Sequence, residues 1–183
     1  MLEAPVAVIP APAPTQQGST LRQSLAERGV IMMKENRTIA NVSTLYGPPI
    51  EVSGQVRVIV KGTIRQLSAG VKLEQSETDR HVASAAFLDS DEIDEFVGAI
   101  DFIVTSAGQM AHDRRDYTEV SYTSKDGVII GFYQDGLKQQ AYVRLGSGSP
   151  LVFIDLETVQ VVRSSITQAR SHAESRRSAW DSR

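Results

Sequence analysis

The chain has 183 residues, of which 41% are hydrophobic and 22% charged, the composition of an ordinary globular protein with one compact domain. Its 19 Lys and Arg residues against 22 Asp and Glu residues give a net charge of -3, which excludes a bulk attraction to phosphate backbones or anionic lipid. The absence of cysteine excludes disulfides, zinc-thiolate sites and thiol catalysis. No apolar run approaches the roughly 20 residues of a transmembrane helix, so we expect a soluble protein.

The first 37 residues predict a tail followed by an ambiguous lead-in. Residues 1–20 are rich in proline and alanine, which favours an extended, disordered arm. Pro10 interrupts the only short apolar run in this arm, so no intact secretory signal is visible, although an exported protein without its signal would look the same. Residues 21–37 allow either a short helix or a strand after Gly29. We therefore place the folded domain at 38–173.

The segment up to Gly108 predicts antiparallel strands that lead into an amphipathic helix. Residues 38–46 count as one strand, apolar alternation at 56–60 and 71–73 indicates two more, and HVASAAFL at 81–88 is the last. The hydrophobic period then changes to that of a helix, which we expect to end at Gly108. One stripe of this helix carries Ile93, Phe96, Val97, Ile100, Ile103, Val104 and Ala107.

Residues 117–173 predict a second unit of the same kind. Its strands YTEVSYT, VIIGFYQ and LKQQAYVRL are separated by Lys125-Asp126-Gly127 and Asp135-Gly136, both strong hairpin signals. A short apolar run at 151–154 leads into a helix over about 156–173. The apolar stripe of this helix carries Val159, Val162, Ile166, Ala169 and Ala173. Residues 174–183 lack this periodicity, so we expect a frayed, disordered tail with Trp180 exposed.

The two units superpose with an offset of 66 residues, the separation of Asp89 and Asp155. The offset pairs Phe87 with Phe153, Ile93 with Val159, Phe96 with Val162, Ile100 with Ile166, Ile103 with Ala169 and Ala107 with Ala173. We therefore predict an α+β domain of two pseudo-symmetric ββββα repeats, about 38–108 and 117–173, whose antiparallel sheets pack with two amphipathic helices. The residues expected to be buried are Phe87, Ile93, Phe96, Ile100, Phe153, Val159, Val162 and Ile166.

The acidic stretch AAFLDSDEIDEF at 85–96 is explained by this repeat. Asp89 and Asp155 occupy the N-cap position of the two predicted helices, and Glu92 completes a capping box with Asp89. The other three acids lie in the first turns of the helix, where the helix dipole favours negative charge. Because the second unit keeps the cap and drops most of the other acids, helix capping is favoured over a metal or catalytic site.

No other constellation predicts catalysis, a metal or a cofactor. His81, His112 and His172 have no second histidine at metal-ligand spacing. The loop Gly146-Ser-Gly-Ser-Pro150 resembles a phosphate-binding loop in composition but precedes a strand, which favours a flexible strand connection. Asp113-Arg-Arg-Asp116 is neutral in sum and is interpreted as a solvated loop. No nucleophile motif is present, so we do not expect an enzyme.

Aromatic residues of the second unit are the feature that folding explains least. Five of them, Tyr117, Tyr122, Phe132, Tyr133 and Tyr142, lie on three neighbouring predicted strands. Phe132 and Tyr133 must point to opposite faces, so at least one of them lies away from the helices. The tentative ligand-binding residues are Tyr122, Tyr133 and Tyr142 for stacking and Lys125, Lys138 and Arg144 for anionic contacts. A structural role for these tyrosines in a half-buried sheet is the favoured alternative.

Two resemblances accompany these motifs. ASAAFLDSDEIDEFVGAIDFI, YTEVSYTSKDGVIIGFYQ and LVFIDLETVQVV, within about 38–173, resemble a group of bacterial proteins, often exported, that have no assigned activity. The tandem ββββα order is similar to the Whirly and PC4-like single-stranded nucleic-acid-binding folds. The lysine-rich Whirly signature Lys-Gly-Lys-Ala-Ala-Leu has no counterpart here, so this second resemblance implies a topology without binding residues.

Two functional hypotheses follow. The first is a non-enzymatic binding or structural module at the cell envelope, with a protein or glycan partner and no cofactor. The alternative is single-stranded nucleic-acid binding through the aromatic second sheet, with a steep loss of affinity as salt increases. The net charge disfavours the alternative, because Glu119, Asp126 and Asp135 lie among its proposed basic contacts.

Overall fold

The computed structural model describes residues 18–76 and 83–182. Most of the predicted N-terminal tail, together with His81, lies outside the described residues. The first sheet (sheet 1) consists of β1 (Ile31–Val42), β2 (Ile50–Lys61), β3 (Ile64–Gln75) and β4 (Ser84–Asp89). The second (sheet 2) consists of β5 (Arg115–Thr123), β6 (Val128–Gly136), β7 (Lys138–Leu145) and β8 (Val152–Ile154). The helices are α1 (Thr20–Ser24), α2 (Ile93–Met110) and α3 (Leu156–Asp181).

Both sheets are antiparallel meanders with the same arrangement. The strand orders are β1-β2-β3-β4 and β5-β6-β7-β8, and a long helix follows each sheet. Gly127 and Gly136 sit in the turns of sheet 2 with φ of 79° and 63°, the left-handed region that glycine enters without strain. The predicted α+β class with two ββββα units is therefore confirmed.

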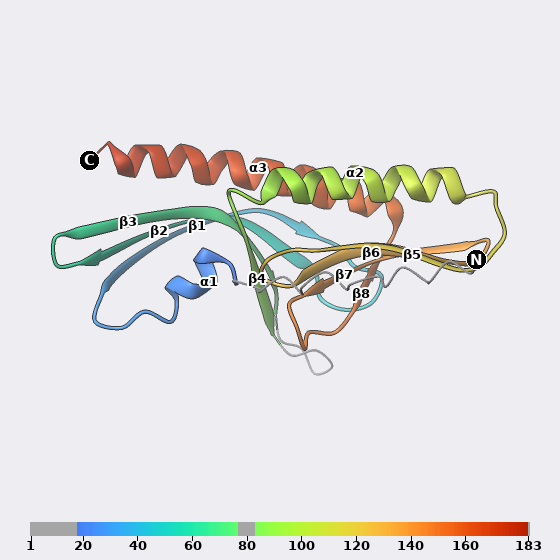
Figure 1. The fold of residues 1–183 in the computed structure, drawn as a ribbon, viewed down its shortest axis with the longest axis horizontal. Helices are drawn as coiled ribbons and strands as arrows, with labels where there is room; N and C mark the ends of the chain where they lie inside the picture. Colours follow the sequence, from blue (N-terminus) through green and yellow to red (C-terminus); the bar gives the residue numbers. More distant parts are fainter. Residues whose placement is uncertain (1–17, 77–82, 183) are drawn as a thin grey trace, which may run out of the picture.

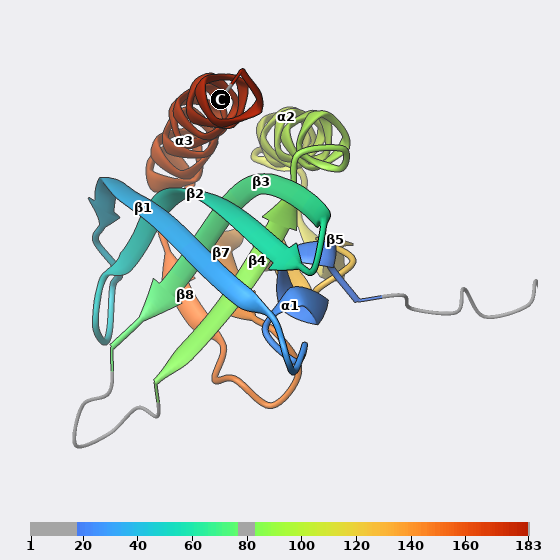
Figure 2. The same cartoon turned by 90° about the vertical axis from the view of Figure 1, so that its left-hand side faces the viewer.

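Each long helix packs mainly on the sheet of the other unit. α2 follows sheet 1 but covers β5 and β6, whereas α3 follows sheet 2 and covers β1, β2 and β3 (Figure 1). The two helices lie side by side on the same side of the sheets (Figure 2). Gly54 permits the close approach of α3, since a Cβ there would lie 2.5 Å from the carbonyl oxygen of Ala169. Because each helix packs on the sheet of the other unit, the two units form one structure.

The helical stripes form the core, as the periodicity predicts. Seven of the eight residues expected to be buried are at most 3% exposed: Phe87, Ile93, Phe96, Ile100, Val159, Val162 and Ile166. The expectation for Phe153 was wrong, because this side chain is only half-buried. Phe153 points away from the helices, on the opposite face of β8 from the buried Val152 and Ile154.

Phe87 likewise points away from the long helices, but α1 and its flanking residues cover its face of sheet 1. The guanidinium of Arg57 lies 4.7 Å from the Phe87 ring centroid and that of Arg22 lies 5.3 Å from it. Arg57 is 1% exposed and donates to Ser24 Oγ at 2.7 Å. Burial lowers its pKa to about 10. α1 thus shields Arg57 from solvent. Without this cover, the same face of sheet 1 would leave the arginine hydrated.

The predicted cap of the first long helix is wrong in one half. Helix α2 begins at Ile93, and Asp89 instead binds α1, accepting from the backbone N–H groups of Thr20 at 2.6 Å and Leu21 at 3.1 Å. The other half of the capping box forms, because Glu92 Oε1 accepts from the Asp89 N–H at 2.9 Å. In the second unit Asp155 caps α3 as predicted, accepting from the Thr158 N–H at 2.6 Å.

The structure also corrects the boundaries at both ends of the domain. The lead-in forms α1 and the start of β1, so the first strand begins at Ile31 instead of residue 38. Helix α3 continues to Asp181, where a disordered tail was expected from residue 174. Trp180 is half-buried and donates from Nε1 to Glu35 Oε2 at 2.9 Å. Sheet 1 extends under this last part of α3, which gives it a surface to pack on.

Candidate functional site

A cavity of about 660 Å³ lies where the two sheets meet. β4, α1 and the residues just before these two elements form one side, with Gly18, Arg22 and Ser84 among its lining residues. The β5–β6 turn and the connection between β7 and β8 form the other side. That second side contributes Thr123, Lys125, Asp126, Gly127, Ile129 and residues 144–150.

Asp126 joins the two sides of the cavity. Its Oδ2 accepts from the backbone N–H of Phe87 at 2.8 Å, and its Oδ1 accepts from Arg22 Nε. Arg22 also donates to the carbonyl of Ala85, the neighbouring edge position of β4. The Asp126 side chain is only 3% exposed, so it is engaged by the protein and not free for a ligand. These bonds satisfy the open edge of β4 and fix the geometry of the cavity.

The glycine-rich connection at 146–150 forms a close-packed wall. Gly146 and Gly148 have φ of 85° and 87°, and the Gly146 N–H donates to the Gly127 carbonyl at 3.1 Å. A Cβ on Gly127 would lie 3.4 Å from Gly146 Cα, so the two turns are in direct contact. Ser147 is exposed beside them. The segment therefore connects two strands, as its composition predicts, and also lines the cavity.

Among the described residues, three cationic side chains line the cavity, and they differ in their partners. Arg22 is paired with Asp126, as described above. Lys125 Nζ lies 2.8 Å from Asp91 Oδ2, and this hydrogen bond raises the pKa of the lysine. Arg144 is half-buried, and its buried Nε has no hydrogen-bond partner in the described chain. Arg144 is therefore the cation best placed to receive an anionic ligand.

The face of sheet 2 away from the helices, which we call the open face, continues from the cavity. Thr123, Ile129 and Arg144 belong to both. Because side chains alternate along strands, residues in step with Arg144 and Thr123 point away from the buried Ile130, Phe132, Ala141 and Val143. The open face carries Tyr117, Glu119, Ser121, Tyr133, Gln140, Tyr142 and Phe153.

Tyrosines on the open face are held around one carboxylate. The rings of Tyr117 and Tyr133 are stacked with centroids 6.1 Å apart and an interplanar angle of 21°. Glu119 accepts hydrogen bonds from the hydroxyls of Tyr117, at 2.8 Å, and of Tyr142. The hydrogen bond to Glu119 raises the pKa of Tyr117, while burial followed by the Glu119 hydrogen bond raises that of Tyr142 to about 12. Tyr117 and Tyr142 therefore remain neutral donors at physiological pH.

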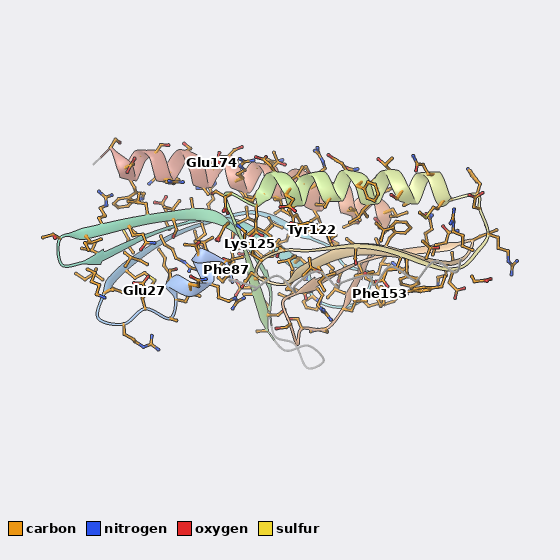
Figure 3. All side chains as sticks on the ribbon, in the orientation of Figure 1. Glu27, Phe87, Tyr122, Lys125, Phe153 and Glu174 are labelled. Atoms are coloured by element: carbon orange, nitrogen blue, oxygen red, sulfur yellow. The ribbon has the colours of Figure 1, made fainter. Side chains whose placement is uncertain are left out.

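The structure brings together four of the six tentative ligand-binding residues. Tyr133, Tyr142 and Arg144 share the open face, and Lys125 joins Arg144 at the cavity. Tyr122 lies on the opposite face beneath α2, with its ring edge-on to Phe96 at 5.6 Å between centroids (Figure 3). Lys138 begins β7 opposite Asp135, at the other end of the sheet from the cavity.

Some residues of this surface were not among those six. Arg22 could not be found from local pattern, because α1 is held at the cavity by contacts with residues far along the chain, among them Asp89 and Asp126. Tyr117 and Glu119 did carry a signal. They differ in parity from Tyr122 along β5, so only one set can face the core.

Two further properties of the described residues concern metals and membranes. No three of their His, Asp and Glu side chains are grouped so as to hold a metal ion. None of the helices placed by the structure has the length and apolar character to span a membrane.

Comparison with known proteins finds no matching family model, no matching curated protein and no matching solved structure.

Proposed function

We propose that this chain is a non-enzymatic binding module and that the cavity between the two sheets binds the anionic group of its ligand. The observation that carries the proposal is Arg144, a half-buried arginine that lines the cavity and whose buried Nε has no hydrogen-bond partner among the described residues. A carboxylate or phosphate can accept two parallel hydrogen bonds from a guanidinium. An anionic ligand would therefore supply the hydrogen-bond partners that an arginine facing a cavity otherwise lacks.

The neighbouring groups support this assignment. Lys125 adds positive charge, and Ser147 adds a hydroxyl from the glycine-rich wall. Among the described residues that line the cavity, the acid is Asp126, and it is already engaged by Arg22 and by the Phe87 N–H. Its negative charge is thereby offset, so repulsion of an incoming anion is reduced.

A thermal-shift titration tests the proposal. Sodium glucuronate and sodium phosphate are added at constant ionic strength, with chloride making up the difference. A ligand at ten times its Kd stabilises the folded state by about 1.4 kcal/mol, so the unfolding temperature should rise. Arg144→Gln should lose this rise. Arg37→Gln, an exposed arginine on β1, is the matched control and should keep it. An equal rise in the Arg144→Gln variant would contradict the proposal.

Location at the cell envelope and a glycan or protein partner belong to the same proposal. They are supported by the sequence resemblance to often-exported bacterial proteins and by an open face rich in tyrosine and hydroxyl groups. Fractionation of the native cells tests the location. Recovery of the protein only in the cytoplasm would remove the envelope from the proposal and leave the binding site as argued.

Single-stranded nucleic-acid binding stays the alternative. It is favoured by Tyr133, Tyr142 and Arg144 sharing one face, and the repeated ββββα order supports an internal repeat with Whirly-like topology. Glu119 argues against it, because this carboxylate sits among the tyrosines where phosphates would pass. Fluorescence anisotropy with labelled oligo-dT at 50 mM and 200 mM salt distinguishes the two, since phosphate contacts require a strong salt dependence.

A further inference from the structure

We infer that the ligand is an oligosaccharide with one acidic sugar, whose carboxylate binds at Arg144 while its neutral sugars lie along the open face of sheet 2. This inference rests on the proposed function and adds the chemical class of the ligand. The cavity and the open face form one continuous surface, because Thr123, Ile129 and Arg144 belong to both.

The open face offers the two kinds of contact that sugars need. A sugar ring presents an apolar C–H face, which packs on aromatic rings, and a rim of hydroxyls, which need hydrogen-bond partners. Tyr117 is 61% exposed and is stacked on Tyr133, so an aromatic surface is available to solvent. Glu119, also exposed, retains acceptor capacity beyond the bonds from Tyr117 and Tyr142, since a carboxylate has about four acceptor sites.

Further polar groups along the strands extend this surface. Gln140 Nε2 donates to the Ile154 carbonyl at 2.8 Å, which fixes the side chain and leaves its Oε1 as an acceptor. Ser121 and Thr123 are exposed on β5 between Glu119 and the cavity. A ligand that passes from Tyr117 to the cavity therefore meets an aromatic ring, then a carboxylate, then hydroxyls, and then Arg144.

The distribution of charge selects among linear ligands. Positive side chains gather at the cavity end, while the middle of the face carries Glu119 and the far hairpin pairs Asp135 with Lys138. Nucleic acid carries a phosphate at every nucleotide and would place some of them near Glu119, at a cost in repulsion. A chain with its charge on a single sugar matches the surface, with the charge at Arg144 and neutral rings elsewhere.

The length of the surface sets the size of the ligand. Six residue steps separate Thr123 from Tyr117 on β5, which corresponds to about 20 Å along the strand. An oligosaccharide of about tetrasaccharide length is suited to cover this distance, whereas a single acidic sugar would occupy only the cavity end.

Four probes separate the contributions in equilibrium titrations. They are xylotetraose bearing one glucuronic acid on its terminal xylose, plain xylotetraose, free glucuronate, and an oligo-dT of similar length. The acidic oligosaccharide should bind at least tenfold more tightly than either glucuronate or xylotetraose, and the oligo-dT should bind more weakly than the acidic oligosaccharide.

Two variants and one control locate the contacts. Arg144→Gln should weaken binding of both glucuronate and the acidic oligosaccharide by at least tenfold. Tyr117→Ala should weaken only the oligosaccharide. Phe102→Ala, which removes an aromatic side chain that is 66% exposed on α2, should change neither.

The outcomes distinguish this inference from the proposed function. If glucuronate binds in an Arg144-dependent way but the oligosaccharide gains nothing or ignores Tyr117→Ala, the inference is overturned and the proposed function stands. Preferential binding of oligo-dT that is lost in Tyr117→Ala would overturn it in favour of nucleic acid. If neither glucuronate nor phosphate nor the acidic oligosaccharide binds, both the inference and the proposed function fail.

Discussion

The carboxylate of Asp126, on the β5–β6 turn of sheet 2, accepts a hydrogen bond from the backbone N–H of Phe87 on β4 of sheet 1 at 2.8 Å. This bond satisfies an edge amide of one sheet with a side chain of the other. Arg22 binds the second oxygen of the same carboxylate. The junction of the sheets, and with it the wall of the cavity, therefore depends on one buried side chain.

Asp126→Ala should destabilise the protein by about 1–3 kcal/mol, because it leaves a Phe87 N–H without its acceptor and Arg22 without its ion pair. Urea unfolding followed by circular dichroism measures this change. Asp101→Ala, which breaks the exposed ion pair with Arg163 between α2 and α3, is the matched control and should have little effect. Equal stability of the Asp126 variant and the wild type would show that the bond does not hold the junction.

Gly54→Ala tests the packing of α3 on sheet 1. The added Cβ would lie 2.5 Å from the Ala169 carbonyl oxygen, a backbone atom that only a shift of the helix can move away. We expect a loss of about 1–3 kcal/mol from overpacking, measured by urea unfolding. Gly98→Ala on α2 meets no atom within 4 Å and should be neutral or stabilise by up to about 1 kcal/mol. If both substitutions behave alike, α3 does not contact β2 at Gly54.

Phe96→Ala tests the covering of sheet 2 by α2. Phe96 is 1% exposed and meets the ring of Tyr122 edge-on, so its removal should cost about 3–5 kcal/mol through lost burial and the resulting cavity. Phe102, on the same helix, is 66% exposed, and Phe102→Ala should leave the unfolding midpoint nearly unchanged. The prediction would be contradicted by a Phe96 variant as stable as the Phe102 variant.

Acid should release the end of α3 from β1. Hydrogen bonds from Arg176 and Trp180 lower the pKa of Glu35 from its ordinary value of 4.5. A carboxyl whose pKa is lower in the folded state stabilises the fold fully above the unfolded pKa and loses this contribution as the pH falls through the folded pKa. The emission of Trp180, the single tryptophan, should therefore change as the pH falls below about 4.5. In Glu35→Gln this transition should be absent, and its persistence would assign it to another group.

Much of the fold follows from hydrophobic periods, which depend on local sequence. The helical stripe through Ile93, Phe96 and Ile100 and the hairpin glycines predict both ββββα units. The stripe cannot tell which sheet a helix covers, since a helix needs only an apolar partner surface. The exchange of α2 and α3 between the sheets was therefore beyond sequence reasoning.

Long-range contacts account for the remaining differences. Asp89 has the residue type and position of a helix cap, yet the amides it binds belong to α1, about 70 residues earlier in the chain. Trp180 lies seven residues after Ala173, in phase with the stripe of α3, but Arg176 interrupts the apolar pattern between them. Its partner Glu35 lies on the first strand. The residues of the candidate site differ in the same way, because some could be named from the local sequence and others depend on long-range contacts. Lys125 and Arg144 were named from the sequence, whereas Arg22 joins them only through the docking of α1.

The central claim, that the cavity between the sheets binds an anionic group, is tested most directly by a ¹H–¹⁵N NMR titration of the full chain with glucuronate at constant ionic strength. We expect saturable shifts in the amides of Arg144, Gly146, Ser147 and Gly148, with none in the hairpin between β2 and β3, and loss of these shifts in Arg144→Gln. Shifts that are absent, that map away from the cavity, or that persist unchanged in Arg144→Gln would contradict it.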